Sequence, residues 1–424
     1  MLSRKGETGI PFSTYRVLIY SHTGNLRRSS LVSSCKYFVA IIQVIVSFCK
    51  LWNEKQEVKF LGLINISIQG DIVVWCFILL IFTSNNLILI FVTGGTGLVG
   101  SRLLYVLLKR GKEVHALARK ESNTAYVKKV FSYYSDQASE LFDRIIWHEG
   151  DVTQPDSLLM EMEGMEEVYH TAAFVSFQPS DKQKIFAVNH RGTENVLNAA
   201  LENKVRKFCH VSSVAALGHS VDGSPINEES EWDFELDKSD YAVSKFLAEM
   251  EVNRAIEEGL SAVIVNPVVI LGSGFWSRGS SSFFRHVYKG MKYYTEGTNG
   301  YVDVRDVVDI MLHLMDNNCF NERFVLSSQC ISYKEILMQI ADNLKVKPPN
   351  KRVTSSMLNL AWRLESLKST LTGKQPKITR KSAKSAEENL IYSNRKVLDQ
   401  LNYSFVPVND TIKFIGDIFL KDKA

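Results

Sequence analysis

The sequence predicts an α/β protein built on a doubly wound parallel sheet, with a smaller lobe toward the C-terminus. Two observations lead to this fold class. From residue 87 onward, short apolar runs alternate with stretches of helical periodicity, which is the pattern of parallel strands joined by crossover helices. The first run, 87–92, leads through a glycine-rich turn at 93–100 into an amphipathic stretch at 101–110.

Composition and charge are those of a globular chain. The 424 residues are 45% hydrophobic and 23% charged, and 50 basic against 46 acidic residues leave a net charge of +4. Nine basic and three acidic residues lie within the first 60, so the rest is nearly neutral and gives no indication of nucleic acid. Six cysteines without a C-x-x-C pair predict neither a metal site nor a disulfide framework, and we expect a cytoplasmic protein.

The first 85 residues are predicted to be an extension whose structure the sequence leaves open. Its apolar stretches, 37–49 and 72–82, are shorter than the roughly 20 residues of a membrane-spanning helix. Residues 1–30 are polar and mixed, which is not the pattern of a secretory signal peptide. Two alternatives stay open: membrane association through residues 37–92, which we do not favour, and an extension that is no part of the folded domain at 86–424.

The glycine-rich turn has the spacing of a phosphate-binding loop. A tight turn at Gly94, close approach of phosphates at Gly97 and close packing of helix on strand at Gly100 would explain the three glycines. The start of the following helix adds N–H donors and a favourable dipole. The residues expected to bind a dinucleotide here are Thr93, Gly94, Gly97, Leu98, Val99 and Gly100.

The end of the next expected strand, 113–118, bears on the choice of dinucleotide. In this position an acidic side chain would bind the adenosine ribose of NAD(H), whereas an arginine accommodates the 2′-phosphate of NADP(H). The residue in this sequence is Arg119. NADP(H) is therefore favoured, and NAD(H) stays open.

Two further strands are expected, at 144–148 and 167–173. Asp151 follows the first of them, and it either accepts a hydrogen bond from the adenine amino group or shapes a turn. His170 lies within the second strand among apolar residues. We therefore expect His170 to be a core residue and not a catalytic base.

A serine, a tyrosine and a lysine form the candidate catalytic group. Ser213 follows a strand at 207–211, where such sheets present ligand-binding groups. Tyr241 and Lys245 are four residues apart near the start of an amphipathic helix that runs through Ala255, so their side chains share one face. The tyrosine–lysine spacing alone is common by chance. With the serine and the glycine turn upstream, in this order, it becomes far more specific.

The spacing suits proton transfer at an oxygen atom. A phenol has a pKa of about 10, and a nearby ammonium group lowers that pKa because it favours the phenolate. Lys245 would supply this charge and hold the nicotinamide ribose, while Ser213 orients the substrate oxygen and Tyr241 transfers the proton. These roles predict hydride transfer between a nicotinamide cofactor and a secondary alcohol or ketone.

On these residues the chain resembles the extended short-chain dehydrogenase/reductase family, which includes NAD-dependent epimerase/dehydratases, dihydroflavonol-reductase-like and 3β-hydroxysteroid-dehydrogenase-like enzymes. The resemblance runs from Leu87 to about Asp306 and implies a Rossmann fold, a small-molecule substrate and a homodimer. The matching segments are Thr93–Gly100, Gly150–Val152, Val168–Ala173, Asn189–Thr193, Ser213 rather than Ser212, and Tyr241 with Lys245. The resemblance adds to the expected cofactor-binding residues Val152, Ala172, Ala173, Asn189, Asn266 and Pro267.

Two positions need separate comment. Asn266-Pro267 resembles the family's R-P segment with asparagine in place of arginine, and this departure weakens a sugar-nucleotide substrate. Asp306, within 301–307, is expected to be the N-cap of a helix in the substrate region and to have no catalytic role.

The C-terminal lobe is predicted to come mainly from residues 270–300 and 325–424. Residues 272–300 combine six glycines with large aromatic side chains. This combination suits a loop that closes over a partly apolar substrate, or one that its aromatic residues merely anchor. Residues 345–384 hold eleven basic residues and one acidic residue around an amphipathic stretch at 357–367. A solvated basic face is favoured there over an anionic ligand or a membrane surface.

We therefore expect an NAD(P)-dependent oxidoreductase acting on a secondary alcohol or ketone. A nucleotide-sugar epimerase or dehydratase with tightly bound NAD is the first alternative, since it shares the initial hydride transfer. A non-catalytic NAD(P)-binding sensor is the second. The presence of Ser213, Tyr241 and Lys245 together argues against a sensor, which would not require all three.

Overall fold

The computed structural model describes residues 88–218, 223–235, 238–372, 375–376 and 379–423. Contacts within the chain divide it between Leu87 and Ile88. The predictions made for residues 1–85, including the apolar stretches at 37–49 and 72–82, lie outside the described residues.

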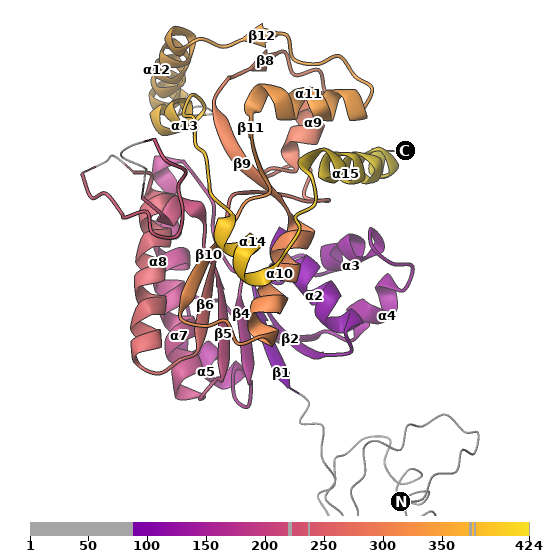
Figure 1. The fold of residues 1–424 in the computed structure, drawn as a ribbon, viewed down its shortest axis with the longest axis vertical. Helices are drawn as coiled ribbons and strands as arrows, with labels where there is room; N and C mark the ends of the chain where they lie inside the picture. Colours follow the sequence, from indigo (N-terminus) through magenta and orange to yellow (C-terminus); the bar gives the residue numbers. More distant parts are fainter. Residues whose placement is uncertain (1–87, 219–222, 236–237, 373–374, 377–378, 424) are drawn as a thin grey trace, which may run out of the picture. The chain divides into compact units, whose positions relative to one another are not determined.

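A seven-stranded parallel sheet forms the core of the part that follows (Figure 1). Its strands are β1 (Leu89–Thr93), β2 (Glu113–Ala118), β3 (Ile146–Glu149), β4 (Glu167–His170), β5 (Lys207–Val211), β6 (Ala262–Pro267) and β10 (Glu322–Leu326). Their order is β10-β6-β5-β4-β1-β2-β3, and every neighbouring pair is parallel. The chain runs outward from β1 in one direction and then in the other, which is the doubly wound topology. The predicted fold class is confirmed.

Helices cover both faces of this sheet (Figure 1). On one face lie α5 (Pro155–Glu161), α7 (Gly192–Glu202) and α8 (Asp240–Glu257), and on the other α2 (Leu98–Lys109), α3 (Ala125–Ser132), α4 (Ala138–Asp143) and α10 (Val304–Asp316). Strand β1 shows how the two cores arise. Phe91 packs with the core beneath α7 and α8, whereas Ile90 and Val92 pack with α2 and α10. Covering on both faces explains why the strands are nearly continuous apolar runs.

A second lobe lies beyond the carboxyl ends of the strands (Figure 1). It contains β7 (Val269–Leu271), β8 (Tyr293–Tyr294), β9 (Thr298–Asp303), β11 (Gln329–Ser332) and β12 (Lys351–Arg352), with α9 (Ser282–Tyr288), α11 (Tyr333–Asn343), α12 (Ser355–Thr372), α13 (Arg380–Ser385) and α15 (Val408–Lys423). Between α13 and α15 in the chain, α14 (Arg395–Leu401) lies beside β10 and buries Val397 in the core of the seven-stranded sheet. Strands pair in the orders β11-β9-β7 and β12-β8. Phe284, Ile336 and Phe419 are buried in its core, so α9, α11 and α15 pack together.

Residues 272–300 are more regular than the sequence suggested. We expected one glycine-rich loop, but this segment contains α9, β8 and the beginning of β9. Helix α9 forms because Phe284 and Val287, three residues apart, bury one face against the lobe's core. The serines at 280–282, expected to belong to the loop, lead into the first turn of this helix.

The start of α10 corrects the expectation for Asp306. The N-cap is Asp303, whose carboxylate accepts a hydrogen bond from the backbone N–H of Arg305 at 2.7 Å. Asp306 lies in the first turn, where it is buried and accepts hydrogen bonds from the Tyr403 hydroxyl at 2.9 Å and the Val406 backbone N–H at 3.0 Å. It therefore fixes the segment that precedes α15.

Two sets of contacts join the lobe to the rest of the molecule. Asp422 of α15 accepts from the Tyr133 hydroxyl after α3 at 2.6 Å, and Lys129 of α3 lies 3.2 Å away; the Trp276 indole, within the lobe, donates to the same carboxylate at 2.8 Å. On the other side, the Gln178 side chain donates to the Pro376 carbonyl at 2.8 Å, and Gln375 donates to Ser180 at 3.0 Å. These bonds hold the α12–α13 region against the segment that follows β4, which includes η2 (Pro179–Asp181), α6 (Lys182–Phe186) and η3 (Ala187–Arg191).

Helix α12 contains the predicted amphipathic stretch. Its exposed apolar residues are Met357, Leu360, Leu364 and Leu367. Within the described part of the chain, no helix combines the length and the apolar content needed to cross a bilayer.

Candidate active site

The parallel strands bring the predicted site residues toward one edge of the sheet, because all carboxyl ends point the same way. In chain order, Thr93–Gly100 follow or end β1, Arg119 follows β2, Asp151 and Val152 follow β3, Ala172 and Ala173 follow β4, Ser213 follows β5, and Asn266 and Pro267 end β6. Tyr241 and Lys245 approach the same edge from α8. The short turn η4 (Val214–Ala216) directly follows Ser213.

The three glycines of the turn each meet a close neighbour. Gly94 has φ +73°, and a Cβ there would lie 2.5 Å from the backbone nitrogen of Ala172. A Cβ on Gly100 would lie 2.2 Å from the carbonyl oxygen of Gly94, whereas one on Gly97 would be 3.2 Å from the same atom. Gly97 is the N-cap of α2 and has no side chain to bond the helix's first N–H groups. The turn therefore offers uncapped donors at a helix start, which suits the pyrophosphate of a dinucleotide.

Thr93 is turned into the protein. Its hydroxyl lies 2.7 Å from His170 Nδ1, and His170 Nε2 lies 3.0 Å from the Thr193 hydroxyl. Thr193 donates to the Asn189 carbonyl at 2.6 Å, so it accepts from His170, and the neutral imidazole carries its proton on Nε2. Burial, with Lys245 as a smaller cause, lowers the pKa of His170 to about 3. The expectation that His170 is a core residue is confirmed.

Asn189 fixes the segment that contains Ala172 and Ala173. It is buried, and its side-chain oxygen accepts from the Phe174 N–H at 2.7 Å. Its side-chain nitrogen donates to the Phe174 carbonyl and to Ser244, each at 3.0 Å. The amide is thus engaged with this chain's own residues, and it holds the segment after β4 beside α8.

Three predicted residues lie along the β2–β3 side. Arg119 is half exposed, with its nearest carboxylate on Glu121 at 3.4 Å. The Asp151 carboxylate accepts from the backbone and the hydroxyl of Thr153, each at 2.8 Å, so it shapes a local turn. Val152 is buried against Gly192 of α7, where a Cβ on the glycine would lie 2.8 Å from the valine side chain.

Ser213 lies near Tyr241. The serine hydroxyl opposes the effect of burial and lowers the pKa of the phenol. The Ser213 hydroxyl also accepts from the Ala215 N–H at 3.2 Å, at the start of η4. Ser212 is different: it is buried, and its hydroxyl donates to Glu249 at 2.5 Å. The structure therefore places Ser213, and not Ser212, beside the tyrosine.

Lys245 lies one turn further along α8 and is completely buried. Its ammonium group donates to the Val211 carbonyl at the end of β5 at 2.9 Å, and His210 Nε2 lies 3.4 Å away. Burial lowers the pKa of Lys245 to about 8, and the carboxylate of Glu249 opposes this shift. The lysine is thus an ammonium below about pH 8.

The expected effect of Lys245 on Tyr241 is not observed. Burial raises the pKa of the Tyr241 phenol above its usual value, and the opposing influence comes from the Ser213 hydroxyl. The reason is the direction of the lysine side chain, because its ammonium group binds the Val211 carbonyl. Ser213 is therefore the residue that favours the phenolate here.

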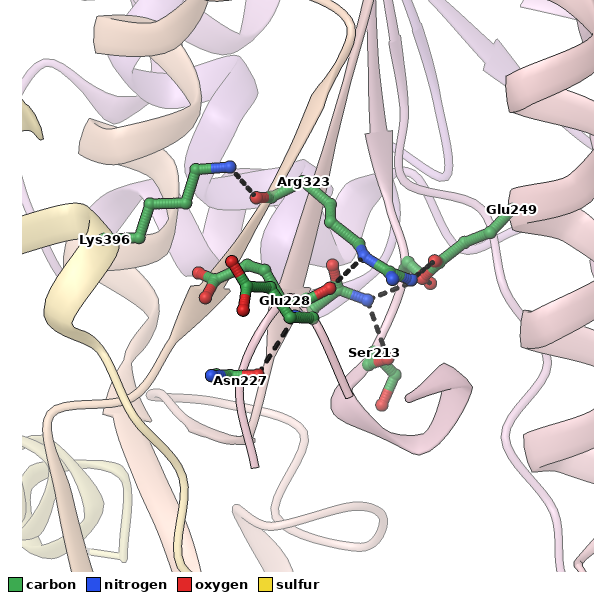
Figure 2. A network of polar contacts seen from close by, with 9 residues as sticks. Ser213, Asn227, Glu228, Glu249, Arg323 and Lys396 are labelled. Atoms are coloured by element: carbon green, nitrogen blue, oxygen red, sulfur yellow. Dashed lines mark hydrogen bonds and ion pairs between the residues drawn. The ribbon is translucent and has the colours of Figure 1, made fainter. Parts of the chain in front are cut away.

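Sequence reasoning missed several residues of the site. The buried carboxylate of Glu249 forms an ion pair with the partly exposed Arg323 near Ser213, with 3.4 Å between Arg323 Nη1 and Glu249 Oε2 (Figure 2). Spacing could have indicated Glu249, which is four residues after Lys245, but Arg323 comes from a distant strand. Val175 and Phe177, 61% and 50% exposed, follow β4, and the Phe177 ring lies 6.1 Å from the Tyr241 ring between centroids. They place apolar surface next to the tyrosine.

Comparison with known proteins agrees with this geometry. The NAD dependent epimerase/dehydratase family matches residues 90–326, more than half of the chain, and the chain belongs to this family. Sterol demethylase protein B of Methylococcus capsulatus is 31% identical over 255 residues, which are 59% of this chain and 73% of that protein. Cinnamoyl-CoA reductase 1 of Arabidopsis thaliana is 29% identical over 262 residues, 59% of this chain and 73% of that protein.

Among solved structures, gox2253 is similar with a TM-score of 0.67 and 27% sequence identity, covering 79% of this chain and 98% of that chain. The expected membership of the extended short-chain dehydrogenase/reductase group is confirmed. The chain is an NAD(P)-dependent enzyme of this type, and the expectation of an oxidoreductase is consistent with its reductase relatives.

Proposed function

We propose that this protein is a reductase that uses NADP(H) to interconvert a ketone or related carbonyl and the corresponding alcohol on a partly apolar small molecule. The observation that carries the proposal is the placement of Ser213 near Tyr241 at the carboxyl end of β5, with the buried ammonium group of Lys245 one helical turn further along α8. The dinucleotide supplies the hydride that adds to the carbonyl carbon.

The residues of this chain supply the remaining steps. Ser213 donates a hydrogen bond that orients the substrate oxygen, and Tyr241 gives that oxygen a proton as the carbon accepts the hydride. The phenolate left on Tyr241 then recovers a proton from water. Lys245 binds the nicotinamide ribose through its ammonium group, and the first turn of α2 binds the pyrophosphate. Asn189 acts indirectly, since it holds the Ala172–Ala173 segment against α8.

The choice of NADP(H) and the class of substrate rest on two further features. Arg119 is exposed at the end of β2, where it can pair with a 2′-phosphate. Val175 and Phe177 present apolar surface beside Tyr241, which suits a hydrophobic substrate skeleton. The names of the relatives, a sterol demethylase protein and a cinnamoyl-CoA reductase, agree with this substrate class. A homodimer and a cytoplasmic location stay predictions.

The test is a screen of apolar ketones and alcohols with the full-length protein, following the absorbance of reduced nicotinamide. Tyr241→Phe removes the proton donor and keeps the ring, so we expect turnover to fall by at least about 100-fold with cofactor affinity nearly unchanged. Ser132→Ala, an exposed hydroxyl on α3, is a control that should behave as the wild type. Undiminished turnover in Tyr241→Phe would remove the tyrosine from the mechanism.

The epimerase or dehydratase alternative is favoured by the family to which the chain belongs. Such an enzyme returns the hydride to its substrate, so the cofactor is not consumed. Equimolar loss of NADPH and carbonyl substrate supports the reductase. Isomerisation or dehydration of a sugar nucleotide without loss of reduced cofactor would replace it with this alternative.

A further inference from the structure

A buried carboxylate continues the catalytic face of α8. Glu249 is four residues after Lys245 and eight after Tyr241, so the three side chains lie along one side of the helix. The Glu249 side chain is 1% exposed. A carboxylate removed from water in this way is costly unless charged and polar partners surround it.

The polar partners of Glu249 are Ser212, which precedes the catalytic serine, and Asn266, which bonds to the carbonyl of that serine. Glu249 Oε1 accepts hydrogen bonds from the Ser212 hydroxyl and from Asn266 Nδ2, each at 2.5 Å. The same Asn266 nitrogen donates to the Ser213 carbonyl at 3.0 Å. Because both acceptors of the asparagine are oxygen atoms, its amide nitrogen has to face them. The carboxylate thus holds Ser212 directly and Ser213 through Asn266.

Arg323, from the edge strand β10, supplies the opposite charge (Figure 2). Its Nη1 lies 3.4 Å from Glu249 Oε2, and its Nε donates to the Glu228 carbonyl at 2.7 Å. Lys396 of α14 donates to the backbone carbonyl of Arg323 at 2.9 Å. The guanidinium group is therefore held by Glu249 and by the Glu228 carbonyl, the Lys396 bond holds only the backbone, and the arginine side chain keeps 35% exposure.

Few titratable groups of the described residues face Lys245. On β4 and β5 these are His170 and His210, and burial keeps both neutral by lowering the pKa of His170 to about 3 and that of His210 well below its usual value. On α8 they are Tyr241 and Glu249. Glu249 is the described group whose charge raises the pKa of Lys245. An ionised Glu249 therefore favours the ammonium form of the lysine.

We propose that Glu249 and Arg323 form a positioning pair, in which the buried carboxylate holds the end of β5 so that Ser213 faces Tyr241, and also favours the ammonium form of Lys245, while the charge of Arg323 favours the ionised carboxylate. The pair also gives a role to Asn266, which stands where the resemblance to the family leads one to expect arginine. In this chain the positive charge comes instead from the neighbouring strand, and the shorter asparagine connects the carboxylate to the serine.

The functional test rests on the proposed reductase activity and uses the full-length protein. Glu249→Gln keeps the size of the side chain and removes its charge. We expect kcat to fall by about 100-fold because Ser213 loses its alignment. The alkaline limb of the pH–kcat profile should also move to lower pH by about one unit, because Lys245 loses the charge that favours its ammonium form. KM for the cofactor should change little.

Variants of Arg323 separate charge from folding. Arg323→Met leaves the buried carboxylate unpaired, so Glu249 takes up a proton and the alkaline limb should move as in Glu249→Gln. The double variant should show no further shift, since both changes remove the same charge. Arg323→Lys keeps the charge and should retain the wild-type limb. Lys396→Met, which removes contacts to the Arg323 carbonyl, to Glu322 and to the Phe324 ring but none to Glu249, is the matched control for altered packing.

A second readout is independent of turnover. The 13Cε signal of Lys245, identified by its loss in Lys245→Met, reports the titration of this lysine by NMR. We expect the pH midpoint of this titration to fall in Glu249→Gln and Arg323→Met. In Arg323→Lys and Lys396→Met it should equal the wild-type value. Absence of turnover in the wild type would count against the reductase proposal alone. An unchanged midpoint and an unchanged pH limb in both Glu249→Gln and Arg323→Met would overturn the positioning pair.

Discussion

Arg119 is the residue on which the proposed choice of cofactor depends. It is half exposed, and its ion pair with Glu121 at 3.4 Å is also exposed to solvent, so the guanidinium group can exchange this partner for a phosphate. We expect Arg119→Ala to weaken NADP(H) binding by about 10- to 100-fold, the worth of one charged hydrogen-bonded contact, and to leave NAD(H) binding nearly unchanged. Fluorescence titration of both reduced cofactors measures the two affinities.

The matched control for this change is Lys112→Ala, which removes a basic residue next to the opposite end of β2. It should alter neither affinity. Equal losses for NADP(H) and NAD(H) in Arg119→Ala would show that the arginine does not recognise the 2′-phosphate.

Single residues also show where sequence reasoning ends. The choice of Ser213 over Ser212 needed only the family spacing, and the structure places Ser213 beside Tyr241. The influence of Lys245 on that tyrosine was wrongly predicted, because helical spacing fixes the side of the helix but not the direction of an ammonium group. Arg323 could not be predicted from spacing, since its partner Glu249 is 74 residues away and the contact exists only once β10 joins the sheet.

At the scale of elements, two glycines test whether the turn between β1 and α2 depends on close backbone contact. They share a positive φ but differ in the space around an added Cβ. Gly94 and Gly111 both have positive φ, +73° and +76°, but only Gly94 has backbone within 4 Å of an added Cβ. Gly111→Ala should cost about 1–2 kcal/mol of unfolding free energy from the backbone conformation. Gly94→Ala should cost more, and it should also weaken cofactor binding, because the turn must move away from Ala172.

Urea unfolding and cofactor titration of the two variants measure this difference. Gly111→Ala serves as the control for backbone conformation without steric contact. Equal stability and equal cofactor affinity in the two alanine variants would show that cofactor binding by the glycine-rich turn does not depend on the close contact between Gly94 and the Ala172 backbone.

Elements with a strong local signal were predicted well. The ranges of β2 and β5 agree with the expected strands at 113–118 and 207–211, because each is a short run bounded by polar residues and turns. Helix α9 was not expected, since its glycine-rich surroundings indicate a loop and its stability comes from burying Phe284 in the lobe. The N-cap of α10 was placed three residues late, at Asp306 in place of Asp303, because either aspartate could precede the apolar face.

For the whole molecule, the two neutral histidines at the centre of the sheet determine how stability depends on pH. His170 and His210 are fully buried on neighbouring strands with ring centroids 5.3 Å apart. The unfolded chain binds protons at these histidines as the pH falls through about 6.5, whereas folded His170 does so only near pH 3. The folded state therefore loses stability as the pH falls below 6.5.

Between pH 7 and pH 5 the contribution of His170 amounts to about 2 kcal/mol of unfolding free energy. Urea unfolding at both pH values should show this loss in the wild type and a smaller loss in His170→Asn. His286→Gln, at an exposed position on α9, should keep the wild-type dependence. The same dependence in His170→Asn as in the wild type would mean that this histidine is not the source.

The overall architecture followed from the sequence because alternating strands and helices admit few topologies, and the glycine turn identifies β1. The architecture of the lobe could not be predicted from the sequence, because its short strands pair with strands that are distant in the chain. Strand β7 pairs with β9, and β9 pairs with β11. No local pattern encodes such pairings. The network beneath Ser213 is of the same kind, since it requires α8, β6 and β10 to be in place together (Figure 2).

The carboxylate of Asp422 has a mechanical consequence. Tyr133, Trp276 and Lys129 all converge on one of its oxygen atoms; Trp276 belongs to the lobe, so a swing of the entire lobe would break the two contacts with Tyr133 and Lys129 together. The α12–α13 region is joined to the opposite wall by the side-chain amides of Gln178 and Gln375 and by Lys381, whose ammonium group donates to the Lys238 carbonyl at 2.5 Å. The lobe is therefore fastened on both sides of the sheet's carboxyl edge, and neither side can move without breaking side-chain contacts.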